Sequence, residues 1–497
     1  MLWTAAAIIP FIAFSLGTAL TKRPWCDEAW FASPALDLVA NGRMGTQVLE
    51  PTGSYFALQR PGVNLDRIDQ HTYWVLPLHF LVLAAWFKIF GFSLAVLRLS
   101  ATAWGLAALA AWYVIVRRLG GSRGLGILAI FLIGIDAAFV DSAADGRMDM
   151  MCAALGFISL AVYLSLREKN VMQAALAGHT VAALGCFTHP NGALASVALL
   201  FVMVYLDRKR LSWTTLLLTG VPYIVGALGW GLYIMQDPAA FRAQFGANTL
   251  GRSAGLMAPL ESIWLEVSFR YLEAHFLPSD SGPFSSIKVL VLAAYLASVV
   301  NMIAVPELRR NPGCRLLLYL TGLRFVMMAV GVSLKYAFYL VYILPFYAVI
   351  LAYALSWLWR RPGRIRWISA MVLSAVVAVQ SVWSLHLIFR YRPYQTKYRP
   401  AVSFLKDNLT PQDLIFGSAE LGFSFGFYNR QIVDDLWFGR WTGKKPTVIV
   451  LDKWRYYKIL IDHKPPEYTE YVTRLLETSF HKVYSQNDGY QIYTRNR

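Results

Sequence analysis

The chain has 497 residues, of which 57% are hydrophobic, 14% aromatic and only 15% charged. A soluble core cannot absorb this much apolar surface, so the composition excludes an ordinary globular protein and predicts a polytopic membrane protein. The net charge of +17 comes from basic residues dispersed between apolar runs rather than gathered in one stripe. We therefore exclude nucleic acid as a partner and assign these charges to membrane topology.

Apolar runs that can cross a hydrocarbon core of about 30 Å predict an α-helical protein with about eleven transmembrane helices. The first run lacks a basic leader and a small-residue cleavage site, so we expect a retained span rather than a signal peptide. The runs cover residues 2–20, 94–116, 125–141, 149–166, 171–187, 193–206, 213–234, 286–305, 315–333, 336–358 and 367–388.

The charges of the connecting segments predict which side each loop occupies. Alternate connections are rich in Arg and Lys, whereas the intervening short ones hold little beyond Arg147 and Lys335. The positive-inside rule then predicts a cytoplasmic N-terminus and an outer C-terminus, in a membrane that we take to be a bacterial inner membrane. Residues 74–90 agree with this alternation of sides only if they form a helix lying along the outer surface instead of crossing the membrane. Residues 21–93 then form one long outer loop.

The first outer loop begins with a carboxylate pair, Asp27-Glu28, between Trp25 and Trp30. A short helix over residues 28–39 is expected to end at Asn41-Gly42. A weaker amphipathic pattern in the outer segment 235–285 indicates an interfacial helix.

After Arg390 the apolar runs shorten to strand length and polar residues fill the spaces between them. We predict a transmembrane domain over residues 1–390 and a small periplasmic α/β domain over residues 391–497. The expected helices cover residues 399–409 and 468–477, and the expected strands cover 413–416, 447–451 and 490–493. The four cysteines have neither metal-site nor disulfide spacing.

Several charged or polar residues, which bilayers disfavour, fall on the outer side of this topology. Because they share one side of the membrane, they indicate a functional site there. A carboxylate there can act as general base on an acceptor hydroxyl, and the alternative for Asp27 and Glu28 is a pair neutralised by Lys22 and Arg23. The residues alone do not separate Asp27 from Glu28. The set comprises Asp27, Glu28, Asp145, Arg147, Asp149, His189 and Lys335, with Arg60, His71 and Arg270 from the longer loops.

Arg147 and Lys335 are candidates for holding a phosphate, Arg through its planar fork and Lys as a point charge. The alternatives are an internal pair of Arg147 with Asp145 or Asp149, and a Lys335 that reaches the interface from a helix end. His189 is either a phosphate or sugar ligand or a helix-end residue. Asp145 and Asp149 are also candidate ligands for Mg²⁺ or Mn²⁺, although we expect no obligatory metal.

The motifs in this order resemble the GT-C glycosyltransferases, and most closely the protein O-mannosyltransferase and aminoarabinose (lipid A) transferase families. The resemblance covers residues 1–390. It rests on Asp27-Glu28, Tyr73-Trp74, Phe90-Gly91-Phe92-Ser93 with Arg98, Arg147-x-Asp149, His189-Pro190-x-Gly192, and Lys335-Tyr336 ahead of Tyr342 and Pro345.

The resemblance implies a GT-C fold, a catalytic base at Asp27 and a polyprenyl-phosphate-linked sugar as donor. By this similarity Arg147, His189 and Lys335 lie near the donor phosphate and Asp149 near the sugar or the base, and we add Glu28 and Tyr336 to the donor-binding set. The family often has Lys or His followed by Pro in the first loop, where this chain has Asp69-Gln70-His71-Thr72-Tyr73-Trp74. The first-loop phosphate ligand is therefore left open between His71 and Arg60.

Our hypothesis is an inverting glycosyltransferase that passes the sugar to a glycan, lipid or protein hydroxyl at the periplasmic face, with membrane lipids as further partners. The alternatives are a transporter of lipid-linked saccharides and an envelope assembly protein without catalysis. A transporter of this kind is expected to have inverted repeats and polar groups at mid-membrane. The sequence has no internal repeat.

Overall fold

The structure is a computed structural model that describes residues 2–51, 65–246, 258–277, 286–429, 431–435, 437–452 and 466–496. Its contacts divide the chain into two compact units. Unit 1 contains residues 1–19, 98–230 and 252–390, and unit 2 contains residues 20–97, 231–251 and 391–497.

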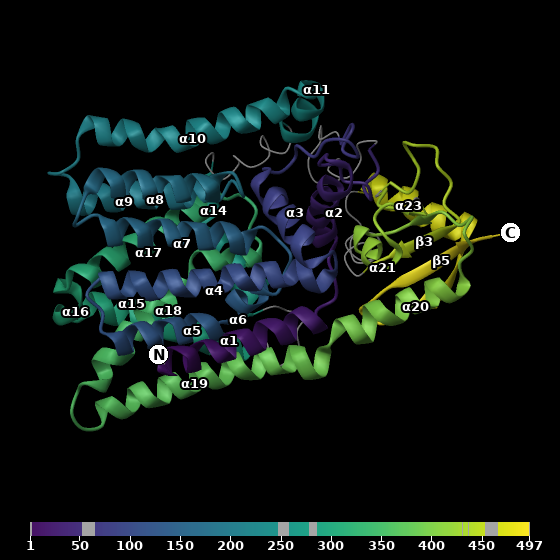
Figure 1. Cartoon of the computed structure of the whole chain (residues 1–497). Coiled ribbons are helices and arrows are strands. Elements are labelled where there is room, and N and C mark those ends of the chain that lie inside the picture. Colours follow the sequence, from purple (N-terminus) through teal and green to yellow (C-terminus); the bar gives the residue numbers. More distant parts are fainter. Residues whose placement is uncertain are drawn as a thin grey trace. The chain divides into compact units, whose positions relative to one another are not determined.

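Unit 1 is helical. Figure 1 shows α7, α8 and α9 alongside one another, consistent with their close packing. Its helices are α1 (Leu2–Thr21), α4 (Leu94–Arg118), α5 (Arg123–Ile135), α6 (Ala137–Ala143), α7 (Asp149–Leu166), α8 (Val171–Cys186), α9 (Gly192–Asp207), α10 (Trp213–Ile234), α14 (Pro259–Leu265), η3 (Glu266–Phe276), η4 (Ser286–Lys288), α15 (Val289–Ala304), α16 (Pro306–Arg310), α17 (Pro312–Gly331), η5 (Ala337–Tyr342), α18 (Leu344–Trp359), α19 (Ile365–Leu385) and η6 (His386–Tyr391).

The core of unit 1 lies around α18, which is buried from Leu344 to Leu355. It packs against α5, α15, α17 and α19. Trp112 of α4 is fully buried and its ring meets Phe346 edge-on at 4.7 Å between centroids. A helix that is apolar all round is typical of the centre of a helical membrane domain.

Among the described residues, six helices are long and apolar enough to cross a membrane, and the bent pair α5 and α6 would make a seventh. Five shorter apolar helices of 10–17 residues accompany them, namely α3 (Leu78–Phe90), α8, α9, α15 and α18. The expected helical membrane-protein class with a small sheet is therefore confirmed, and the count of eleven spans stays a prediction.

Two of the expected spans differ from the helices observed. The run 125–141 is broken between α5 and α6, whose axes differ by 70°. The run 336–358 becomes the 3-10 helix η5 followed by α18, because Pro345 stands at the start of α18, where a missing N–H costs nothing. The expected helix breaks at 145–149 and 188–192 lie between α6 and α7 and between α8 and α9.

Asp136 stabilises the bend between α5 and α6. Its Oδ1 accepts hydrogen bonds from the backbone N–H groups of Ala138 at 3.0 Å and Phe139 at 3.2 Å. Its Oδ2 accepts from the Tyr295 hydroxyl at 2.8 Å and from Gln380 Nε2 at 3.0 Å. One carboxylate thus caps α6 and joins it to α15 and α19.

Replacing Asp136 with Ala is expected to destabilise the protein through two effects. The buried donors left without an acceptor cost about 1–3 kcal/mol, and the lost cap costs about 1 kcal/mol. Thermal unfolding in detergent measures the loss. Asn311→Ala, which removes only the exposed cap of α17, is the matched control, and an equal shift in both variants would contradict this role of Asp136.

Unit 2 contains a five-stranded sheet (yellow in Figure 1) of order β2-β1-β3-β5-β4. β1 is parallel to β2 and β3, whereas β5 is antiparallel to β3 and β4. The strands are β1 (Ile415–Phe416), β2 (Ile432–Val433), β3 (Val448–Leu451), β4 (Phe480–Ser485) and β5 (Gln491–Arg495), and the helices are α2 (Cys26–Asn41), α3, α11 (Pro238–Phe241), η2 (Arg242–Gly246), η7 (Tyr394–Tyr398), α20 (Arg399–Asn408), η8 (Ala419–Leu421), α21 (Gly422–Phe425) and α23 (Pro466–Ser479).

The helices and strands expected after residue 390 are confirmed as α20, β1, β3, α23 and β5, whereas β2 and β4 were not predicted. The helix expected over 28–39 is α2, and it begins two residues earlier. Gly42 follows its last residue at φ 72°, a left-handed conformation that glycine adopts without strain. Within the segment 235–285, where an amphipathic helix was expected, α14 and η3 are helical over residues 259–276, and α11 and η2 precede them; the rest of the segment lies partly outside the described residues.

Candidate functional site

The carboxylate pair lies in the first turn of α2, where its two members have different environments. Glu28 is fully buried, and its Oε2 accepts the backbone N–H of Trp25 at 3.0 Å, so it caps the helix. Asp27 is partly exposed, and the Cys26 thiol lies 3.7 Å from its Oδ1. The positive end of α2 stabilises both charges. Of the two, Asp27 is the more exposed.

Trp30, one turn after Asp27, anchors α2 within unit 2. Its indole Nε1 donates to Asp434 Oδ2 at 3.2 Å, and the same oxygen accepts from the Ala419 backbone N–H at 2.9 Å. Asp434 follows directly after β2, and Ala419 is the third residue after β1. The carboxyl ends of two parallel strands therefore hold the helix that carries Asp27.

Of the two first-loop phosphate candidates, Arg60 lies outside the described residues. His71 stacks on Tyr73 with 5.6 Å between ring centroids, and the Tyr73 hydroxyl donates to the Tyr233 carbonyl at 3.0 Å. Burial lowers the pKa of His71 below its usual 6.5. At pH 7 the imidazole is therefore neutral and would meet a phosphate as a hydrogen-bond donor rather than as a cation.

In unit 1, Arg147 and Asp149 form a buried ion pair at the start of α7, with 2.9 Å between Nε and Oδ2. The other oxygen of Asp149 accepts the Tyr342 hydroxyl at 3.2 Å. The Arg147 guanidinium lies 3.9 Å from the centroid of the Phe338 ring. This is the internal pair that the sequence left as an alternative. A guanidinium has five N–H donors, so the pair with Asp149 does not by itself exclude a phosphate contact, which stays a prediction.

Lys335 belongs to a buried cluster of one acid and two cations, here called the Glu266 cluster. Glu266 pairs with Arg270 at 2.5 Å and with Lys335 at 3.2 Å. Arg270 also donates to the Leu334 carbonyl at 2.7 Å. Lys335 is therefore no snorkelling lysine, and the cluster carries one net positive charge. Tyr336 beside it is 40% exposed and stacks on Phe338.

His189 packs near two of the same tyrosines, 5.6 Å from Tyr339 and 6.5 Å from Tyr342 between ring centroids. Its Nδ1 lies 3.0 Å from the backbone N–H of Asn191 and therefore accepts a hydrogen bond. That contact places the proton of a neutral ring on Nε2.

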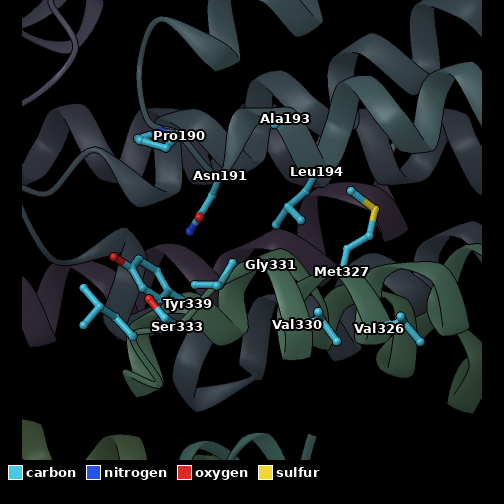
Figure 2. A pocket seen from close by; sticks show the side chains of 12 residues that line it. Pro190, Asn191, Ala193, Leu194, Val326, Met327, Val330, Gly331, Ser333 and Tyr339 are labelled. Carbon is cyan, nitrogen blue, oxygen red and sulfur yellow. The ribbon is translucent and has the colours of Figure 1, made fainter. Parts of the chain in front are cut away.

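A cavity of about 460 Å³ opens beside these residues and is mostly apolar (Figure 2). Its walls come from residues 190–194 at the start of α9, residues 326–334 at the end of α17, and Tyr339. Asn191 extends into it toward Tyr339 and Ser333 (Figure 2). The Asn191 Nδ2 is buried and, among the described residues, has no hydrogen-bond partner. The cavity is an apolar chamber with an unsatisfied donor at one end.

The expected metal ligands do not come together as a metal centre in the part of the chain that the structure describes, where no group of three or more His, Cys, Asp or Glu is close enough to hold an ion. Asp149 is already engaged by Arg147 and Tyr342. Binding of a divalent cation by Asp145 and Asp149 stays a prediction.

Comparison with solved structures places this arrangement among known folds, while no family model and no curated protein matches the sequence. ArnT from Cupriavidus metallidurans bound to undecaprenyl phosphate matches with a TM-score of 0.56 and 15% identity over 99% of this chain and 97% of that one. AglB, the oligosaccharyltransferase of Archaeoglobus fulgidus, matches in complex with an inhibitory peptide and a dolichol-phosphate at TM-score 0.52 and 12% identity, over 100% of this chain and 74% of that one. An Archaeoglobus fulgidus oligosaccharyltransferase in complex with zinc and sulfate matches at TM-score 0.57 and 14% identity, over 98% of this chain and 73% of that one.

The chain has the GT-C fold. The resemblance drawn from short motifs is thereby confirmed for the architecture. The GT-C fold and the apolar helices together indicate an integral membrane protein. The roles of the individual residues stay predictions.

Sequence reasoning named Arg270 but not its partner Glu266, and it did not single out Asn191 or Arg324. Asn191 is the unspecified position of the motif His189-Pro190-x-Gly192, and it was passed over because it carries no charge. Glu266 and Arg270 have the i, i+4 spacing of a helical ion pair, which is the signal that could have joined them. Arg324 is buried within α17 and was hidden in an apolar run; its guanidinium lies 5.6 Å from the Phe346 ring centroid.

Proposed function

We propose that this chain is an inverting glycosyltransferase of a bacterial inner membrane. It takes a sugar from a polyprenyl-phosphate-linked donor and transfers it to a hydroxyl acceptor at the periplasmic face, where its C-terminal domain also lies. The observation that supports this most is the apolar cavity next to the Glu266 cluster, in a fold shared with a protein bound to undecaprenyl phosphate.

The cavity and the cluster suit the two halves of such a donor. Residues 332–334 line the cavity, and the carbonyls of Val332 and Leu334 accept hydrogen bonds from Arg270. The first isoprene units would fill the apolar chamber, with a gain of about 0.8 kcal/mol for each buried CH₂ group. The phosphate would then lie near Lys335, Arg270 and the Asn191 amide.

In the proposed reaction Asp27 accepts the proton of the acceptor hydroxyl as its oxygen attacks the anomeric carbon. The bond between that carbon and the phosphate oxygen breaks, and polyprenyl phosphate leaves with both bonding electrons. A single displacement inverts the anomeric configuration, as in inverting glycosidases. Lys335, Arg147 and His189 stabilise the charge that grows on the leaving phosphate.

The other residues of the predicted site receive supporting roles. Asp149 orients Arg147. As the first residue of α7, its carboxylate could also accept a hydrogen bond from a sugar hydroxyl. Glu28 fixes the first turn of α2 and so the position of Asp27. His71 or Arg60 supplies a further phosphate contact from the first loop, and Tyr336 offers an aromatic face.

Turnover with defined donors tests this function. The purified full chain is incubated with a panel of polyprenyl-phosphate sugars and a membrane extract as acceptor source, and release of polyprenyl phosphate is measured. Consumption of one donor class is expected. If a folded preparation consumes none of them but moves a lipid-linked saccharide across liposomes, the transporter alternative replaces the proposal.

A further inference from the structure

A second cavity in unit 1 contains a buried cation that the proposed reaction does not use. It has a volume of about 190 Å³ and lies between the start of α15 and the end of α19. Its walls are aliphatic apart from three residues, Lys288, Trp383 and His386. The cavity proposed for the donor, of about 460 Å³, differs in composition because its lining residues contain no cation.

Lys288 is held inside the protein rather than extended to the surface. It is only 6% exposed, and its Nζ lies 3.6 Å from the centroid of the Trp383 ring. Among the described residues its hydrogen bond goes to the His275 carbonyl, at 3.3 Å. Within the described ranges it has no ion pair. Asp141 and Asp136 interact with its charge only over a longer distance.

An ammonium group has three donors, and burial without an anion is costly. One weak hydrogen bond and one ring face offset only part of that cost, so the site favours an anion that enters from the cavity. The neighbouring wall carries the exposed apolar side of α19, with Val382 47% and Leu385 42% exposed. An anion that brings its own hydrocarbon chain matches both features.

We propose that this cavity binds the phosphate of an anionic membrane lipid, with the phosphate on Lys288 and an acyl chain along α19. Trp383 holds the ammonium in place through its ring face, and His386 is a further polar residue of the lining. The site is separate from the donor phosphate, so it would make the enzyme responsive to the lipid composition of its membrane. Charge complementarity favours phosphatidylglycerol over phosphatidylcholine of the same chain length.

Native mass spectrometry of the full chain in neutral detergent tests the proposal by counting bound lipids. Phosphatidylglycerol, phosphatidylcholine and inorganic phosphate are titrated separately. Lys288→Met is expected to lower the affinity for phosphatidylglycerol at least tenfold and to leave phosphatidylcholine unchanged. Ala378→Phe, which narrows the cavity without touching the charge, is expected to cause a similar loss.

Arg364→Gln is the matched control, because it removes an exposed positive charge at the other end of α19, and phosphatidylglycerol binding is expected to persist. Unchanged phosphatidylglycerol binding in both cavity variants would overturn the proposal. Inorganic phosphate that binds as tightly as the lipid would replace it with a free-anion site. Since Lys288 has no part in the proposed reaction, any of these results leaves the glycosyltransferase proposal to its own test.

Discussion

Asp27→Asn is expected to lower sugar transfer by about 10²–10⁴-fold, the range that general-base catalysis contributes. The amide cannot accept the proton of the acceptor hydroxyl, whereas its size and its place in the first turn of α2 are retained. Binding of the donor lipid is expected to stay within about threefold of wild type, because the residue acts on the acceptor. Transfer is measured as release of polyprenyl phosphate under single-turnover conditions.

The neighbouring carboxylate provides the control. Glu28→Gln removes the charge that caps α2 but leaves Asp27 in place, so its main effect is expected on thermal stability, with a loss of about 1 kcal/mol. An Asp27→Asn protein that retains wild-type transfer would remove Asp27 from the base role. A loss of transfer in Glu28→Gln that is as large as in Asp27→Asn would assign the catalysis to the pair instead.

Glu266→Gln is expected to destabilise the protein by about 3–5 kcal/mol, because it leaves two buried cations without their acid. Arg270 is fully buried and Lys335 is 7% exposed, and Glu266 is the acid that pairs with each in the described residues. Desolvation of both cations is then uncompensated. Thermal unfolding followed by tryptophan fluorescence measures the effect, and undecaprenyl phosphate is expected to restore part of the lost stability by replacing the missing anion.

The control for this variant is the same substitution at an exposed pair. Glu307 is 59% exposed at its side chain and pairs with Arg361 at 2.7 Å. Exposed pairs contribute about 0–1 kcal/mol, so Glu307→Gln is expected to have a small effect. If the two variants unfold at the same temperature, Glu266 does not compensate the buried charges of Arg270 and Lys335, and the account of the Glu266 cluster is wrong.

Local sequence signals predicted the elements well where one signal dominates. Asn41-Gly42 ends α2 as expected, and most of the apolar runs became single helices with ends within a few residues of those predicted. The failures occur where tertiary partners decide. Asp136 breaks a continuous apolar run because Tyr295 and Gln380, more than 150 residues later in the chain, supply its hydrogen bonds.

The site was predicted as a set of residue types and one shared side, not as contacts. The partner of Lys335 could not be read from its neighbours, since Glu266 lies 69 positions earlier in the chain. Similarly, β2 has only two residues and exists because β1 pairs with it. Pairing at this distance depends on the folded chain, and no periodicity in the sequence encodes it.

The location of the donor lipid tests the central claim most directly. Undecaprenyl phosphate with a photoreactive diazirine in its first isoprene units is cross-linked to the full chain, and labelled peptides are identified by mass spectrometry. Labelling of residues 190–194 and 326–334 is predicted, with a decrease in Lys335→Met. Labelling confined to the exposed apolar faces of α10 and α19, with both cavity segments unlabelled, would contradict the account.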